Sequence, residues 1–181
     1  MTLFKNRYRI ESARLPSWNY GGSGWYFITI CTHKRLHFFG QIINGTVHLS
    51  AMGEIVAEEW QKTSQIRPNV ILDEWVIMPN HFHGIIGIHN QPPVETFRRN
   101  VSTNEPKLQP NSLGAIVGQF KSVCTKRIRA AGFSEFGWQT RFYDRIIRDE
   151  SELNRIRRYI RNNPSNWKAD RHHSRARDSI R

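Results

Sequence analysis

The sequence predicts one α+β domain over residues 24–167, a sheet with helices packed against it. Three observations predict this class. The chain has 181 residues, which is the size of one ordinary domain. Segments rich in β-branched and aromatic residues alternate with segments whose apolar residues recur at helical spacing. Their order is strand, helix, strand, strand, helix, strand, followed by one more helix.

Four segments have the composition of strands. Residues 25–32 read WYFITICT, which is aromatic and β-branched almost throughout. Val70–Met78 and His81–Ile88 are separated only by Pro79-Asn80, and this spacing predicts a tight hairpin. A shorter fourth strand is expected over residues 142–148, FYDRIIR.

Three segments have the spacing of helices. The first spans residues 49–64, and the second begins at Ser112 with a long apolar stripe. The third follows Asp149, which stands three residues before a glutamate in the pattern of a capping box. It should run to Asn163, because Pro164 cannot continue it. The combined order is that of a ferredoxin-like βαββαβ sandwich with an additional C-terminal helix.

Three segments lie outside this core. Residues 1–23 form a polar, basic N-terminal arm with a glycine-rich end, and residues 168–181 form a basic C-terminal tail. Residues 89–111 are rich in Asn, Pro, Gln and Thr and have no apolar periodicity, which indicates an exposed excursion.

Charge is the most informative part of the composition. The chain has 27 Lys and Arg residues against 15 Asp and Glu, a formal net charge of +12, and a pI near 10.4. A polyanionic partner is the simplest explanation. Nucleic acid is favoured over an anionic membrane surface, because no cationic amphipathic segment stands apart from the core helices.

Several other classes are disfavoured. No apolar run approaches the roughly 20 residues that span a bilayer, and the N-terminus lacks the apolar stretch of a secretory signal, so we expect a cytoplasmic protein. No glycine-rich phosphate loop is visible, so we expect no nucleotide cofactor. Cys31 and Cys124 lack the spacing of metal ligands and are expected to be reduced thiols.

His81 and His83 are the first candidate site residues. Side chains at i and i+2 of a strand leave the same face, so the two imidazoles point together while Phe82 points into the core. Two imidazoles supply two of the three protein ligands of a facial metal site. Alone this is a weak signal, since histidines on strands are more often ordinary surface groups.

The third helix adds a polar pair. Leu153, Ile156 and Ile160 define its buried stripe, and at about 100° per residue Asn163 falls almost in line with Ile156. Tyr159 and Asn163 are i, i+4 neighbours on the helix. The Asn163 amide oxygen would complete a site suited to Mg²⁺ or Mn²⁺, with Tyr159 one turn away as nucleophile. Each also has a plainer interpretation, Asn163 as a C-cap and Tyr159 as a packing residue.

Four segments resemble one known family. They are, in order, FITICTHKRLHFFG, VIMPNHFHGII, SLGAIVGQFKS and WQTRFYDRIIRDESELNRIRRYIRNNPSNW. Together they resemble the REP-associated tyrosine transposases, a branch of the single-tyrosine transposases within the HUH nuclease superfamily. The resemblance covers residues 24–167, and MPNHFHGII and RYIRNNP fall where that family places its two catalytic motifs.

The resemblance implies a role for each of these residues. His81 and His83 would be metal ligands, Tyr159 the nucleophile, and Asn163 the third, amide-bearing ligand, where some relatives have glutamine. It implies cleavage of single-stranded DNA beside a REP-type hairpin through a 5′-phosphotyrosine, with later rejoining, and it favours a monomer over a dimer. Contacts to DNA are expected from basic residues and a nearby aromatic ring. The candidates are Lys121, Lys126, Arg127, Trp138, Arg141 and Arg145.

Three alternatives stay open at this level. A non-catalytic nucleic-acid-binding module of the same fold would stack bases on strand aromatics such as Trp25 and Phe27. A structural zinc protein would need a better ligand set than the scattered histidines provide. Tyr143 lies in the matching region and is the rival of Tyr159 as nucleophile.

Overall fold

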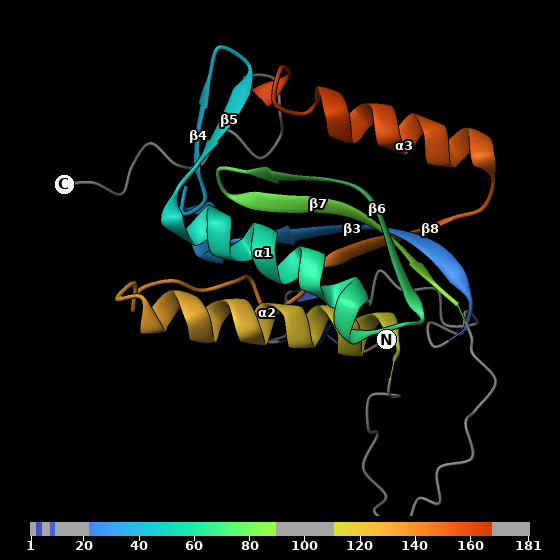
Figure 1. Ribbon diagram of the computed structural model, residues 1–181, viewed down its shortest axis with the longest axis horizontal. Helices are drawn as coiled ribbons and strands as arrows, with labels where there is room; N and C mark the ends of the chain where they lie inside the picture. Colours follow the sequence, from blue (N-terminus) through green and yellow to red (C-terminus); the bar gives the residue numbers. More distant parts are fainter. Residues whose placement is uncertain (1–2, 5–7, 10–21, 90–110, 168–181) are drawn as a thin grey trace, which may run out of the picture.

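The computed structural model describes residues 3–4, 8–9, 22–89 and 111–167 (Figure 1). The predicted tail, the predicted excursion except for its two end residues, and most of the predicted arm lie outside these ranges. Within the arm, β1 (Leu3–Phe4) pairs with β2 (Tyr8–Arg9) as a short antiparallel ladder.

The central sheet has four antiparallel strands in the order β6-β7-β3-β8. The strands are β3 (Gly24–Cys31), β6 (Val70–Met78), β7 (His81–Ile88) and β8 (Tyr143–Ile147). All four predicted strands are present, and β6 and β7 have the predicted bounds. They join through the two-residue turn Pro79-Asn80, as the spacing predicted.

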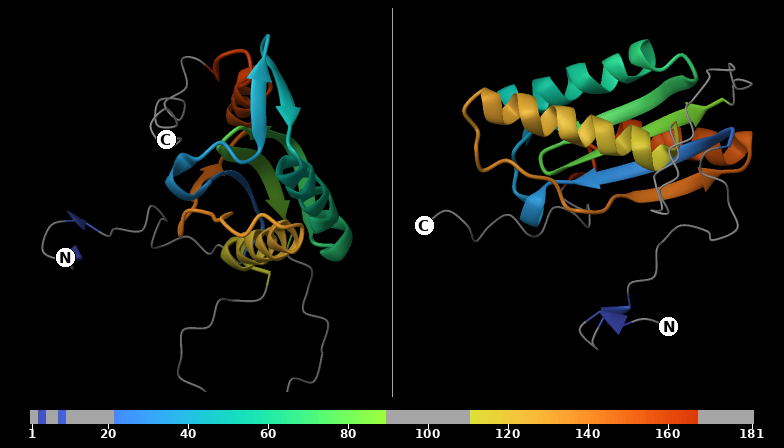
Figure 2. Two further views of the ribbon diagram at one scale, coloured as in Figure 1. Left: turned by 90° about the vertical axis from the view of Figure 1, so that its left-hand side faces the viewer. Right: turned by 90° about the horizontal axis from the view of Figure 1, so that it is seen from below.

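Helices cover both faces of this sheet (Figures 1 and 2). α1 (Ala51–Ile66) and α2 (Leu113–Ala130) lie side by side on one face, and α3 (Glu150–Asn162) crosses the other. The strand and helix order around the sheet is the predicted one, and the predicted α+β class is confirmed. No helix within the described ranges is both long and apolar enough to cross a membrane.

Each helix starts at a polar capping residue. The side chains of Ser50, Ser112 and Asp149 accept hydrogen bonds from backbone N–H groups three residues later. At α3 the second half of the predicted capping box differs from the usual pattern. The Glu152 carboxylate accepts from the N–H of Arg148, at 3.1 Å, so this carboxylate binds the residue before the cap.

A β-hairpin of the domain was not predicted from the sequence. A hairpin of β4 (Gly40–Ile43) and β5 (Thr46–Leu49) stands between β3 and α1, after the short 3-10 turn η1 (His33–Arg35). The predicted helix start at residue 49 was therefore two residues early, because residue 49 still belongs to β5. The local signal was Asn44-Gly45, a turn dipeptide in which both residues have positive φ, 51° and 77°.

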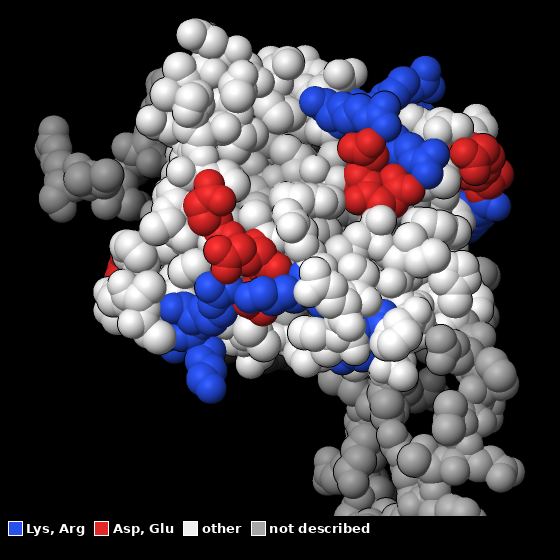
Figure 3. All heavy atoms as spheres, in the orientation of Figure 1, with Lys and Arg blue, Asp and Glu red and all other residues white. Residues whose placement is uncertain are grey.

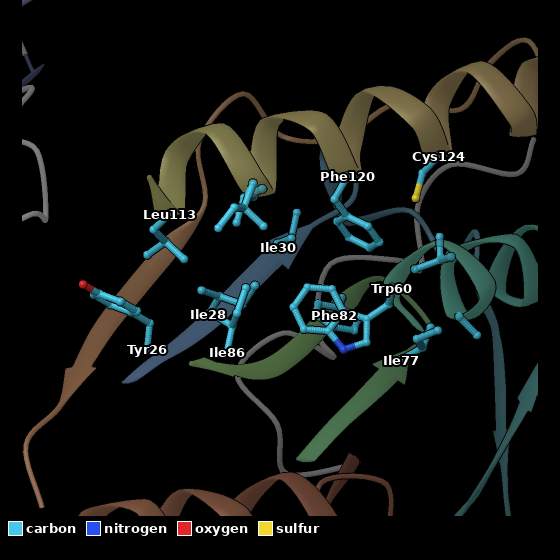
Figure 4. Packing of buried hydrophobic residues seen from close by; sticks show 14 of the residues in the cluster. Tyr26, Ile28, Ile30, Trp60, Ile77, Phe82, Ile86, Leu113, Phe120 and Cys124 are labelled. Atoms are coloured by element: carbon cyan, nitrogen blue, oxygen red, sulfur yellow. The ribbon is translucent and has the colours of Figure 1, made fainter. Parts of the chain in front are cut away.

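The sheet separates two apolar clusters. Tyr26, Ile28 and Ile30 of β3 face α1 and α2 and pack with Trp60, Phe120 and the core residues shown in Figure 4. The alternate residue Phe27 faces α3 with a smaller cluster. The rest of that cluster is Ile85, Ile147, Leu153, Ile156 and Ile160, which includes the predicted buried stripe of α3. Cys31 and Cys124 are both buried, and neither forms a disulfide in the described part of the chain.

Candidate active site between the sheet and helix α3

His81 and His83 lie on the face of β7 that α3 covers. Their side chains are 0 % and 1 % exposed, and their ring centroids are 4.5 Å apart. Phe82 points to the opposite face and packs against Trp60, with centroids 4.6 Å apart. The alternation of a strand therefore brings the two imidazoles together, as the sequence predicted.

Each histidine has a buried hydrogen-bonding partner at Nδ1. His83 Nδ1 is 2.8 Å from Thr29 Oγ1, and His81 Nδ1 is 2.8 Å from Asn80 Oδ1. Because an amide oxygen can only accept, the contact with Asn80 leaves the proton of neutral His81 on Nδ1 and a lone pair on Nε2. Asn80 is itself anchored, since its amide nitrogen donates to the Arg35 carbonyl at 3.2 Å.

Tyr159 of α3 contacts His83. Its hydroxyl oxygen is 3.3 Å from His83 Nε2, and its ring packs edge-on against Phe27 with centroids 6.0 Å apart. The residue is 44 % exposed, so its hydroxyl stands at the border between the buried site and solvent. The tertiary fold thus joins a helix residue and a strand residue that are 76 positions apart.

Tyr143 lies on the same sheet face at a different place. Thr29 of β3 is paired with His83 on one side and with Tyr143 on the other. Two strand spacings, about 10 Å, therefore separate the backbones of Tyr143 and His83. The side chain of Tyr143 is 43 % exposed.

Asn163 ends α3 and is buried. Its N–H donates to the Ile160 carbonyl at 3.2 Å, so the C-cap interpretation applies. The side chain is 3 % exposed, and its amide oxygen Oδ1 is buried without a hydrogen-bond partner in the described part of the chain. Such an orphaned buried acceptor is unusual in a folded protein. A cation is one group that would satisfy it.

Trp167, shortly after the end of α3, packs beside the site. Its ring centroid is 5.9 Å from that of His81 and 5.6 Å from that of His37. Thr29, Asn80 and Trp167 were not among the predicted site residues. Asn80 adjoins the histidines in the sequence and could have been considered, whereas Thr29 is found only once the register of β3 and β7 is known.

Two ion pairs fasten α3 to β6. Arg157 binds Asp73 with both ends of its guanidinium, at 2.9 and 2.6 Å, and Arg161 Nε donates to Glu74 at 2.8 Å. An irregularity in the pairing of β6 between Leu72 and Trp75 accompanies these two acidic residues. The hydrogen bonds from Arg157 hold the pKa of Asp73 below its ordinary value.

The metal-ligand set is small. Over the described ranges, no group of three or more His, Cys, Asp or Glu side chains could hold a metal ion. The candidate set is two imidazoles and one amide oxygen. The base-stacking alternative also meets an obstacle, because Phe27 is 9 % exposed and packs beneath α3 instead of facing solvent.

Two of the predicted DNA contacts are engaged with carboxylates. Arg127 forms ion pairs with Glu58 and Glu59 at 2.8 and 2.6 Å and so connects α2 to α1. Arg145 lies 2.6 Å from Glu152. Figure 3 shows the same mixing of basic and acidic side chains over α1 and α2 and over α3.

The other candidates lie near α2. Lys121, Lys126 and Trp138 line one open groove, and Arg141 is exposed just beyond it. Lys121 donates to the carbonyls of Gln139 and Thr140 at 2.7 and 3.1 Å, and burial lowers the pKa of its ammonium group.

Comparison with solved structures defines the class of the fold. The structure of a REP-associated tyrosine transposase bound to a REP hairpin matches 80% of this chain and 68% of that chain, with a TM-score of 0.53 and 19% sequence identity. The fold is therefore of the REP-associated tyrosine transposase type. A candidate transposase from Deinococcus radiodurans R1 has a TM-score of only 0.46 at 12% identity, too low to support an inference.

Comparison by sequence gives the family. An uncharacterized protein of Haemophilus influenzae (strain ATCC 51907 / DSM 11121 / KW20 / Rd) is 37% identical over 163 residues, which are 88% of this chain and 91% of that protein. The chain belongs to the same family as this Haemophilus protein. No protein-family model matches it.

Proposed function

We propose that this protein is a metal-dependent DNA transposase that cleaves single-stranded DNA beside a hairpin, with Tyr159 as nucleophile. The observation that carries the proposal is the 3.3 Å separation between the Tyr159 hydroxyl and His83 Nε2, beside a second buried histidine. The transposase-like fold and the basic chain support DNA as the substrate.

His81, His83 and Asn163 would hold the divalent cation, Mg²⁺ or Mn²⁺. The residues fit such an ion, because the Asn163 amide oxygen is buried and unsatisfied in the described part of the chain, and the contact with Asn80 leaves a lone pair on Nε2 of His81. When bound, the cation would withdraw charge from a non-bridging phosphate oxygen.

Tyr159 would then form a covalent bond to DNA. Its hydroxyl oxygen bonds to phosphorus, and the bond between phosphorus and the 3′ oxygen breaks. The proton that leaves the tyrosine is balanced by the proton taken up by the free 3′-hydroxyl. The products are a 5′-phosphotyrosine and a 3′-hydroxyl end, and attack by another 3′-hydroxyl reverses the step and rejoins DNA without a nucleotide cofactor.

The test is a labelled DNA hairpin with single-stranded flanks, incubated with Mg²⁺ or Mn²⁺. We expect a covalent protein–DNA adduct with the native chain and none with Tyr159→Phe, which should still bind the hairpin. Tyr143→Phe is the matched control and should keep cleavage. Chelation of the metal by EDTA should abolish the adduct in every case.

Three outcomes would contradict the proposal. Loss of the adduct in Tyr143→Phe and its persistence in Tyr159→Phe would transfer the role to the other tyrosine. Hairpin binding without an adduct, over a range of REP-like hairpins and both metals, would favour a non-catalytic nucleic-acid-binding module. Tightly held zinc in the purified protein would favour the structural zinc alternative.

A further inference from the structure

A basic groove runs along α2 on the side of the sheet away from α3. It is open, with a volume of about 510 Å³, and lies between the second half of α2 and residues 137–140. Its residues are Lys121, Ser122, Thr125, Lys126, Arg129, Gly137, Trp138, Gln139 and Thr140. In the view from below, the chain leaves the end of α2 and returns past it to β8 (Figure 2, right).

The cations of this groove differ from Arg127, Arg157 and Arg161 in what they bind. Lys121 donates to two backbone carbonyls, and Arg129 donates to the Phe136 carbonyl at 3.1 and 3.4 Å. Lys126 is exposed, and no carboxylate is among the described residues that line the groove. Carbonyl groups are neutral and do not offset a positive charge, whereas carboxylates offset the charges of Arg127, Arg157 and Arg161.

The side chains of the groove are suited to contacts with phosphate groups and poorly suited to base stacking. The Trp138 ring packs against Phe39, Phe120 and Phe136, and its Nε1 donates to the Lys121 carbonyl at 3.2 Å. The ring is only partly exposed and contacts three aromatic neighbours, so it has a mainly structural role and offers little surface on which an unpaired base would stack. Cations and hydroxyls without a stacking platform suit the backbone of a double helix better than unpaired bases.

The groove also lies close to the candidate active site. The Gln139 N–H donates to the Cys31 carbonyl at 2.9 Å, and Cys31 is paired with His81 across β3 and β7. Two strand spacings, about 10 Å, therefore separate the backbones of Gln139 and His81. At about 3.4 Å per stacked nucleotide this distance corresponds to roughly three nucleotides.

We propose that this groove binds the phosphate backbone of the hairpin stem, a few nucleotides from the phosphate that Tyr159 attacks. The placement of the stem relative to the attacked phosphate rests on the proposed function, but binding of DNA to the groove can be measured without cleavage. Arg141 is exposed and follows the groove residue Thr140 in the chain, so under this proposal it would be a further contact to the same DNA.

Binding should be measured in the Tyr159→Phe background with three DNAs: a hairpin with a single-stranded flank, a blunt duplex of the same stem, and the unpaired flank alone. We expect Lys126→Ala to weaken binding of the hairpin and the duplex and to reduce the slope of log K against log salt concentration by about 0.9, the value for one lost phosphate contact. Adding Arg129→Ala should double that reduction. Binding of the flank alone should not change.

Controls separate this proposal from a general effect of charge or from misfolding. Lys62→Ala removes a charge of α1 that is already paired with Glu59 and should leave the slope unchanged. Lys126→Glu alters one exposed side chain, so the fold should survive, and it should weaken hairpin binding more than Lys126→Ala. An unchanged affinity and slope in Lys126→Glu, or an equal loss for the unpaired flank, would overturn the proposal. Persistent cleavage by Tyr159→Phe would refute only the proposed function.

Discussion

At the scale of single residues, the site depends on the groups that form hydrogen bonds with the Nδ1 atoms of the two histidines. Thr29 and Asn80 each bind one Nδ1 at 2.8 Å, and both are buried. Partners of this kind fix the orientation of an imidazole and set which ring nitrogen is available to a metal. Asn80 and Thr29 are therefore positioning residues for the two proposed ligands.

The first prediction concerns these positioning residues. Asn80→Ala should weaken Mn²⁺ binding about 10–100-fold, because His81 loses the acceptor that orients its ring. Thr29→Val should weaken Mn²⁺ binding to a similar extent, because His83 loses its partner at Nδ1. Isothermal titration with Mn²⁺ measures the affinity without reference to cleavage, and Gln61→Ala, an exposed change on α1, serves as control. Unchanged Mn²⁺ affinity in folded Asn80→Ala and Thr29→Val proteins would show that these residues do not position the metal ligands.

At the scale of secondary-structure elements, α3 decides whether the site exists. Its apolar face packs on Phe27, Ile85 and Ile147, and its arginines bind consecutive acidic residues of β6. The apolar contacts hold the helix against the sheet. The bidentate Arg157–Asp73 pair fixes where along the sheet it lies, and hence where Tyr159 stands relative to His83.

The second prediction is a pH dependence of this attachment. Asp73→Asn should lower the free energy of unfolding by about 1 kcal/mol at neutral pH. Because the native pKa of Asp73 lies below its unfolded value of about 3.9, its contribution is fully present above that value and is lost as the pH falls through the native pKa. The difference between the native chain and Asp73→Asn should thus be constant above about pH 5 and shrink in more acidic solution.

Denaturant unfolding at a series of pH values measures this difference. Glu74→Gln, which removes the carboxylate from a more exposed pair, should have a smaller effect. A stability difference that stays the same down to pH 2 would show that the Asp73 carboxylate does not contribute as an ion.

At the scale of the whole molecule, one chain holds every residue of the proposed site. His81 and His83 come from the sheet, and Tyr159 and Asn163 come from a helix that packs on that same sheet. This arrangement favours a site completed within one subunit. Charge is also unevenly distributed over the molecule. Carboxylates pair with Arg157 and Arg161 of α3 and with Arg127 on the side of α2 next to α1, and they are absent from the described residues lining the groove of α2.

The third prediction follows from the single-chain site. Tyr159→Phe and His83→Ala proteins should each fail to form the adduct, and a mixture of the two should fail as well, because neither chain can supply the other's missing group. Gel analysis of the labelled hairpin measures the adduct, and sedimentation should show a monomer. Activity restored by mixing would show that α3 is exchanged between subunits.

Local periodicity was enough to predict much of this protein. The bounds of β6 and β7, the starts of α2 and α3, the shared face of His81 and His83, and the i, i+4 relation of Tyr159 and Asn163 all follow from backbone geometry within a few residues. The β4–β5 hairpin was missed although Asn44-Gly45 marks its turn and Thr46–Leu49 alternates polar and apolar residues, because each of its strands is only four residues long.

The tertiary structure alone decided which of these parts meet. The contact of Tyr159 with His83 and the burial of Asn163 depend on how α3 packs on the sheet, and the pairing of Thr29 with His83 depends on the register of β3 and β7. The partners of Arg127 and Arg145 likewise became known only from the fold. Such contacts join residues far apart in the chain, and their stability comes from packing and charge pairing over the whole molecule, which no short window of sequence contains.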